Sequence, residues 1–124
     1  MQIPEHNNVG GTFPFTAYDM EGGYYVHAGI EGDVLYPYYA DVFEKHGYSG
    51  NGECWAGHIA AILLHLDTGL LHRINFDPEA GLFAAKFNFE SDRSRFLQLL
   101  CPIFTHIPTL ESWIMKADRD AIDD

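Results

Sequence analysis

The chain has 124 residues, of which 47% are hydrophobic, and its eighteen acidic residues outnumber seven basic ones to give a formal net charge of -11. A chain of this length supports one hydrophobic core, so we expect a single domain over residues 1–124. The acidity disfavours direct contact with nucleic acids and with anionic membranes, because both are bound through lysine and arginine. A basic protein is the natural complement, although the charge also fits the plain role of keeping a protein soluble.

No targeting or membrane-spanning segment is recognisable in the sequence. Residues 1–8 lack a basic stretch followed by an apolar one, and the longest apolar run, residues 59–64, is too short to cross a bilayer. Two cysteines, Cys54 and Cys101, are too few for a secreted disulfide scaffold. We therefore expect a protein of the reduced cytoplasm that does not enter a membrane.

The first half of the chain predicts a hairpin followed by two helices. Aromatic-rich runs at residues 13–19 and 23–28 flank a turn that contains glycine, which is typical of a β-hairpin. Apolar residues then recur at spacings of three and four over residues 34–46 and again over residues 53–66. This period indicates two helices, with Pro37 acceptable in the first turn of the earlier one.

The second half begins with another predicted hairpin. Residues 71–77 and 82–89 have the pattern of two strands, and the segment between them contains the proline and glycine of a turn. Strict alternation in the second strand places every second residue from Phe83 to Phe89 on one core-facing side.

Two C-terminal helices are predicted from their apolar stripes and their caps. Ser91 is a suitable N-cap for the first, which Pro102 is expected to kink or end near Leu100. Thr109 is a suitable cap for the second, and residues 118–124 are expected to form an acidic, frayed tail. Together the elements predict an α+β fold of order ββααββαα, in which an antiparallel sheet built from β-hairpins carries helices on one face.

Residues with reactive side chains do not assemble into a catalytic or metal-binding motif. His58, His65 and His72 are spaced by seven, which in a helix separates neighbours by about 10 Å along the axis, too far for one ion to join them. Neither a Gly-x-Ser-x-Gly elbow nor a cysteine with identifiable histidine partners occurs. We therefore predict no catalytic residue, no metal and no cofactor, and we keep a small hydrolase that uses Cys54 or His58 as an alternative.

Aromatic and acidic side chains gather near the first predicted helix and form the candidate contact surface. Its residues are Glu31, Asp33, Tyr36, Tyr38, Tyr39 and Asp41. Tyrosines beside carboxylates suit a basic protein surface, because the rings bury area and the acids pair with cations. One helix cannot bury all three tyrosines, so at least one is expected at the surface. Two tyrosines in the core and one at the surface without a role explain the pattern as well as a contact surface does. Tyr39 also falls on the apolar face of the predicted helix.

Two separated segments carry a family resemblance. Residues 47–55 read GYSGNGECW and residues 76–83 read FDPEAGLF, and this pair resembles the paired signature of the immunity protein 51 family. Those proteins are associated with bacterial polymorphic toxin systems, in which a small cytosolic partner neutralises a cognate toxin. Two positions depart from the pattern, since Glu53 stands where an aromatic residue is common and Leu82 where methionine is common.

The residues shared with that pattern predict architecture rather than contact with a partner. They are Gly47, Gly50, Asn51, Gly52, Trp55, Phe76, Asp77, Pro78, Gly81 and Phe83. The glycines permit a loop between two helices, while the aromatic residues anchor a helix and bracket a tight turn.

The resemblance implies an immunity protein, not an enzyme, that binds a cognate protein toxin in the bacterial cytoplasm. We expect the acidic, tyrosine-bearing residues near the first predicted helix, rather than the shared motif residues, to form the contact surface. A basic nuclease is one toxin that this surface would suit, because carboxylates compete for the cationic groups that hold phosphates. Two alternatives stay open. They are the small hydrolase and a ligand-binding or oligomerising module built on the aromatic hairpin.

Overall fold

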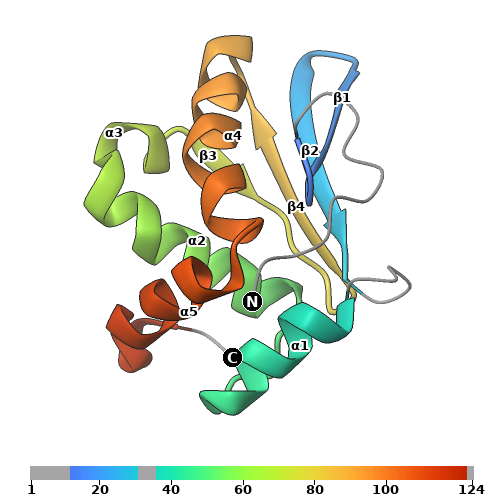
Figure 1. The fold of residues 1–124 in the computed structure, drawn as a ribbon. Helices are drawn as coiled ribbons and strands as arrows, with labels where there is room; N and C mark the ends of the chain where they lie inside the picture. The colour runs from blue at the N-terminus through green and yellow to red at the C-terminus, as the bar shows by residue number, and fades with distance from the viewer. Residues whose placement is uncertain (1–11, 31–35, 123–124) are drawn as a thin grey trace.

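A computed structural model of the chain describes residues 12–30 and 36–122, and these form a sheet with helices on one side of it (Figure 1). The sheet is antiparallel in the order β1-β2-β4-β3, with strands β1 (Thr16–Met20), β2 (Gly23–Gly29), β3 (Ile74–Phe76) and β4 (Leu82–Phe87). The helices are α1 (Tyr36–Lys45), α2 (Gly52–Leu66), α3 (Thr68–Leu71), α4 (Glu90–Phe104) and α5 (Ile107–Lys116), followed by the 3-10 helix η2 (Arg119–Ala121). The predicted α+β class is confirmed, and the one-turn helix α3 is an addition to the predicted order.

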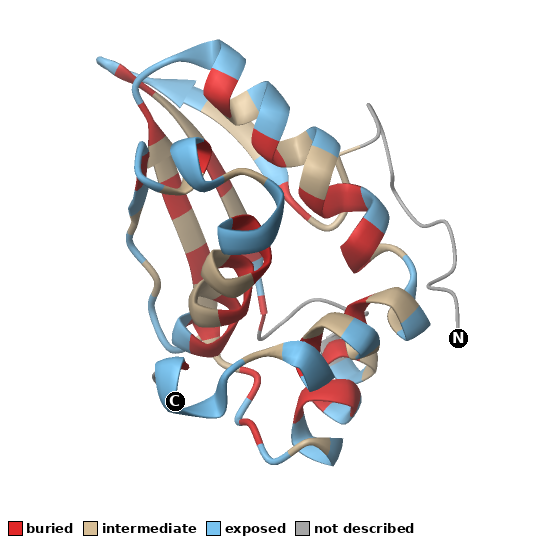
Figure 2. Cartoon of the chain, turned by 90° about the vertical axis from the view of Figure 1, so that its left-hand side faces the viewer, coloured by how far each residue is buried: buried red, intermediate tan, exposed pale blue. Residues whose placement is uncertain are grey.

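The two hairpins join through their inner strands, β2 and β4, which form the centre of the sheet. Val26 lies opposite Ala85 and Ala28 lies opposite Phe83. All four side chains are buried beneath the helices, and buried residues alternate along the strands in Figure 2. The alternation predicted for the second strand is therefore confirmed through Phe87.

Phe89 was expected on the same buried face, and this prediction is wrong. Strand β4 ends at Phe87, and Phe89 is 61% exposed at the N-cap position of α4. The strand period therefore stops two residues early, because the chain leaves the sheet to start a helix.

An extra turn of helix shortens the third strand. Residues 71–77 were predicted to be a strand, but only Ile74–Phe76 pairs with β4. Asp67 accepts a hydrogen bond from the backbone of Leu70 at 3.0 Å and caps α3, which buries the Leu70 side chain. The strand therefore starts at Ile74, three residues later than predicted, because α3 and the turn after it occupy residues 68–73.

The C-terminal helices begin earlier than their predicted caps. Helix α4 begins at Glu90, so that Ser91 lies inside its first turn, and α5 begins two residues before Thr109. Pro102 does not end α4, which continues to Phe104. Pro102 and Gln98 are both exposed, so water can solvate the backbone carbonyl that a proline leaves without its usual partner.

The C-terminal segment is folded through Ile122 rather than frayed from residue 118. Arg119 donates hydrogen bonds to the carbonyls of His46 at 2.9 Å and Gly47 at 2.7 Å, and its guanidinium lies 4.4 Å from the centre of the Tyr48 ring. Ile122 is buried. Asp123 and Asp124, the rest of the predicted tail, lie outside the described residues.

Aromatic rings from both hairpins and from three helices share the core. The ring of Phe15, just before β1, stands edge-on to Trp55, Phe83, Phe96 and Phe104 at centroid distances between 5.3 and 6.3 Å. All five side chains are at most 2% exposed. Contact among aromatic edges and faces in one cluster fixes α2 and α4 against the sheet.

Candidate functional site

The two segments of the predicted motif lie against each other at the start of α2. Gly47 and Gly50 adopt φ values of +85° and +78°, a region that glycine enters without steric cost. Asn51 caps α2 by accepting a hydrogen bond from the backbone of Cys54 at 2.8 Å. The backbone N–H of Gly52 then donates to the carbonyl of Ala80 at 3.0 Å, in the turn between β3 and β4.

Gly52 has no room for a side chain. A Cβ at this position would overlap the carbonyl oxygens of Glu79 and Leu82. One helical turn further along, Trp55 is buried with its ring centroid 6.4 Å from that of Phe83, which follows the same turn of the sheet. The motif therefore forms a packed joint between α2 and the β3–β4 turn.

The other motif residues complete this joint. Asp77 is exposed, but its backbone N–H donates to the carbonyl of Ala84 at 2.9 Å, and the carbonyl of Gly81 accepts from Ile30 at 3.0 Å. Phe76 and Pro78 are half-buried. These backbone bonds fix the turn, and none of them requires a partner protein.

The structure describes only part of the predicted contact surface. Glu31 and Asp33 lie outside the described residues, and Tyr36 opens α1 without a described side chain. Asp41 is exposed and Tyr38 is half-buried on the same helix. The structure thus keeps two of the six predicted residues together at an accessible surface.

Tyr39 is a core residue, and its assignment to the contact surface is corrected. It is 4% exposed, its hydroxyl donates to the carbonyl of Phe104 at 2.8 Å, and its ring centroid lies 4.9 Å from that of Trp55. A side chain held in this way by α4 and α2 is not available to a partner. Its position on the apolar face of the helix was the signal for this role.

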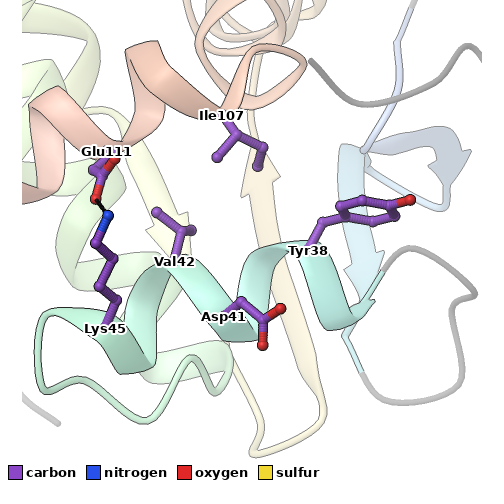
Figure 3. A pocket seen from close by; sticks show the side chains of 6 residues that line it. All are labelled: Tyr38, Asp41, Val42, Lys45, Ile107 and Glu111. Carbon is purple, nitrogen blue, oxygen red and sulfur yellow. Dashed lines mark ion pairs between the residues drawn. The ribbon is translucent and has the colours of Figure 1, made fainter. Parts of the chain in front are cut away.

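A hollow lies between α1 and α5 and contains the two accessible residues of the predicted surface. Its volume is about 250 Å³, and we call it the two-helix hollow; it is lined by Tyr38, Asp41, Val42, Lys45, Ile107 and Glu111. Val42 and Ile107 point toward each other across the gap between the helices (Figure 3). The hollow therefore combines an apolar floor with an aromatic ring and charged groups.

An ion pair and a hydrogen bond, both made by Glu111, lie at one end of the two-helix hollow. Glu111 lies 2.9 Å from the ammonium of Lys45 and 2.7 Å from the Nε2 atom of His46, and Figure 3 shows the first of these pairs. Hydrogen bonds from Lys45, and next from His46, lower the pKa of Glu111 below its ordinary value. Sequence analysis did not identify Lys45, Glu111 or Ile107, because residues so distant in the chain carry no local signal of their contact.

The proposed hydrolase residues are buried. Cys54 is 0% exposed and His58 is 1% exposed, so neither can reach a substrate in solution. Burial raises the pKa of Cys101 to about 11, which leaves this thiol protonated and weakly nucleophilic at neutral pH. Among residues 12–30 and 36–122, no group of histidine, cysteine or acidic side chains is placed to hold a metal ion.

These features define an α+β fold with an accessible hollow between α1 and α5. In the part of the chain that is described, no helix has the length and apolarity needed to span a membrane. A family model described as Immunity protein 51 matches residues 32–118, most of the chain. The chain therefore belongs to the immunity protein 51 family, which confirms the resemblance seen in its two motif segments. Neither a curated protein nor a solved structure gave a significant match.

Proposed function

We propose that the protein is an immunity protein that binds and neutralises a cognate bacterial toxin, with the two-helix hollow in its contact surface. The observation that carries the proposal is the hollow itself, in which Tyr38 and Asp41 stand beside an apolar floor on the surface of an immunity protein 51 family member. The toxin would be met in the bacterial cytoplasm, a reducing compartment that suits two buried thiols.

Charge supports a basic partner. Asp41 is exposed and forms no ion pair within the described residues, so its carboxylate is available to a cation on another protein. A net charge of -11 also attracts a basic partner over a distance and speeds association at low salt. If the toxin is a nuclease, acidic groups of this chain would occupy the toxin's active site in place of the substrate's phosphates.

The side chains beside Asp41 favour a stable contact. Tyr38 is half-buried, so its ring is already held in place and loses little conformational freedom when a partner covers it. Tyrosine is enriched among the few residues that dominate binding energy at protein interfaces. Ile107, which is half-buried, adds apolar surface to the same hollow.

Co-expression tests the proposal. Cells that produce the toxin encoded by the adjacent open reading frame should survive when they also produce this chain. The variant D41K should lose protection, while E44K, which makes the same charge change at an exposed position of α1 outside the hollow, should keep it. Both variants must melt near the wild-type temperature. Equal protection by wild type and D41K would remove this surface from the proposal, and no protection by wild type would refute the function.

The oligomerising module remains a second candidate because of the sheet face that points away from the helices. There the rings of Tyr18 and Tyr25 stack at 5.3 Å with an angle of 12°, and His27 lies 5.0 Å from Tyr18. Aromatic side chains on a sheet face suit self-association. Light scattering that shows a monomer at every concentration would exclude this candidate.

A further inference from the structure

A second hollow lies on a different part of the surface, where α2 meets the segment after β3 and the 3-10 helix η2. Its volume is about 380 Å³, and we call it the Glu53 hollow; it is lined by Glu53, Ala56, Gly57, Phe76, Pro78 and Ala121. It shares no lining residue with the two-helix hollow.

Small residues and the C-terminal segment together create this hollow. Glu53 and Gly57 are four positions apart in α2 and therefore lie on one face of the helix. A Cβ at Gly57 would lie 3.2 Å from a methyl carbon of Ile122, so glycine lets the C-terminal segment approach the helix closely. The bonds from Arg119 to the His46 and Gly47 carbonyls hold that segment in place.

The lining of the Glu53 hollow combines one charged residue with apolar walls. Glu53 is exposed and is the single ionisable residue among the six that line the hollow. The walls are apolar, and Phe76 and Pro78 are each half-buried and so keep part of their surface open. A ligand that fits must bring positive charge to one end and apolar or planar surface to the rest.

We infer that the Glu53 hollow binds an arginine side chain of a partner protein. The methylene groups of arginine would cover Ala56 and Ala121, while its guanidinium group would pair with the Glu53 carboxylate. A planar guanidinium stacks on aromatic rings such as Phe76 and pairs with both oxygens of a carboxylate, which the ammonium of lysine cannot do. The inference rests on the proposed function in one respect: it assumes that the arginine belongs to a partner protein. It adds to the two-helix hollow a second contact site, which recognises arginine.

Nuclear magnetic resonance titration of the full chain with Nα-acetyl-arginine amide tests this inference. The amide of Gly57 and the methyl groups of Ala56 and Ala121 should shift saturably. The variant E53Q should weaken the affinity by about two- to five-fold, as expected for loss of an exposed charge pair. The matched variant E44Q, at an exposed glutamate outside the hollow, should leave it unchanged. Nα-acetyl-lysine amide should bind more weakly than the arginine compound.

Three results would overturn the inference. They are the absence of saturable shifts at these positions, equal affinities of E53Q and wild type, and equal affinities for the arginine and lysine compounds. The test is separate from that of the proposed function, because it needs no toxin. A chain that binds the arginine compound but fails to protect cells would refute the toxin role alone. A chain that protects cells and ignores the compound would refute the arginine site alone.

Discussion

Replacing Gly52 by alanine tests whether the family motif acts as a packed joint. A Cβ at position 52 would overlap the carbonyl oxygens of Glu79 and Leu82 and would lie 2.8 Å from the carbonyl carbon of Leu82. All three atoms belong to backbone, which cannot turn aside as a flexible side chain can. Either α2 or the β3–β4 turn must therefore move.

The expected loss of stability follows from three contributions. Overpacking of this kind costs about 1–3 kcal/mol. Displacement of the helix also weakens the hydrogen bond from Gly52 to Ala80, which contributes about 1 kcal/mol. Alanine regains at most about 1 kcal/mol through its higher helix propensity. The balance is a destabilisation of about 1–3 kcal/mol, which for a chain of this size lowers the melting temperature by about 4–12 °C.

Thermal and urea unfolding measured by circular dichroism check this value. Gly29→Ala is the matched control, because a Cβ at position 29 meets no atom within 4 Å. Its stability should stay within about 0.5 kcal/mol of wild type. A Gly52→Ala protein as stable as the control would show that the approach of α2 to the turn is not tight, and would refute the reasoning.

Three further predictions concern other parts of the fold. Arg119→Ala should lower the free energy of unfolding by about 1 kcal/mol, because it removes two hydrogen bonds to backbone carbonyls, and an unchanged urea midpoint would contradict the folded C-terminal segment. A hydrogen bond from Lys45 lowers the pKa of Glu111 in the folded state. The ionised Glu111 therefore stabilises the fold at pH values above its ordinary pKa of 4.5, and this stabilisation is lost as the pH falls through the lowered pKa. Glu111→Gln should therefore be less stable than wild type at pH 7, and this difference should shrink on acidification; a difference independent of pH would refute the ion pair. Cys54 and Cys101 should both resist a thiol reagent in the native protein at pH 7.5 and react after unfolding, whereas a fast native thiol would revive the hydrolase alternative.

The features predicted most accurately were those that a short-range repeat of apolar residues determines. Alternation along residues 82–87 identified the core-facing side of β4, because each residue of a strand points opposite to its neighbour. Helical spacing likewise located α2 within one residue of its start. The boundaries failed where two local preferences compete, as at Asp67, whose side chain caps an extra turn of helix where only the end of the preceding helix was expected.

Contacts between distant parts of the chain were beyond sequence reasoning. His46 and Glu111 are separated by 65 positions, and Arg119 lies 72 positions from Gly47. Each pair meets only because the helices pack in one arrangement, and no local pattern records that arrangement. Of the six residues that line the two-helix hollow, Tyr38 and Asp41 were among the predicted contact residues, whereas Ile107 and Glu111 on α5 were not.

Tyr38 and Tyr39 show how a composition argument differs from a geometric one. Both were assigned to the contact surface because tyrosines beside acids suit a protein partner. Adjacent residues of a helix point about 100° apart, so one of the two turned into the core and the other stayed accessible. Treating the pair by helical position rather than by residue type separates the buried tyrosine from the accessible one.

The most direct test of the proposed function is calorimetric titration of the purified chain with the product of the adjacent open reading frame. We expect a saturable complex for wild type and E44K, and a loss of affinity of about ten-fold or more for D41K, because the reversed charge faces a basic partner. Equal affinities for wild type and D41K would contradict the assigned surface, and no binding by the wild-type chain would contradict the toxin-immunity role.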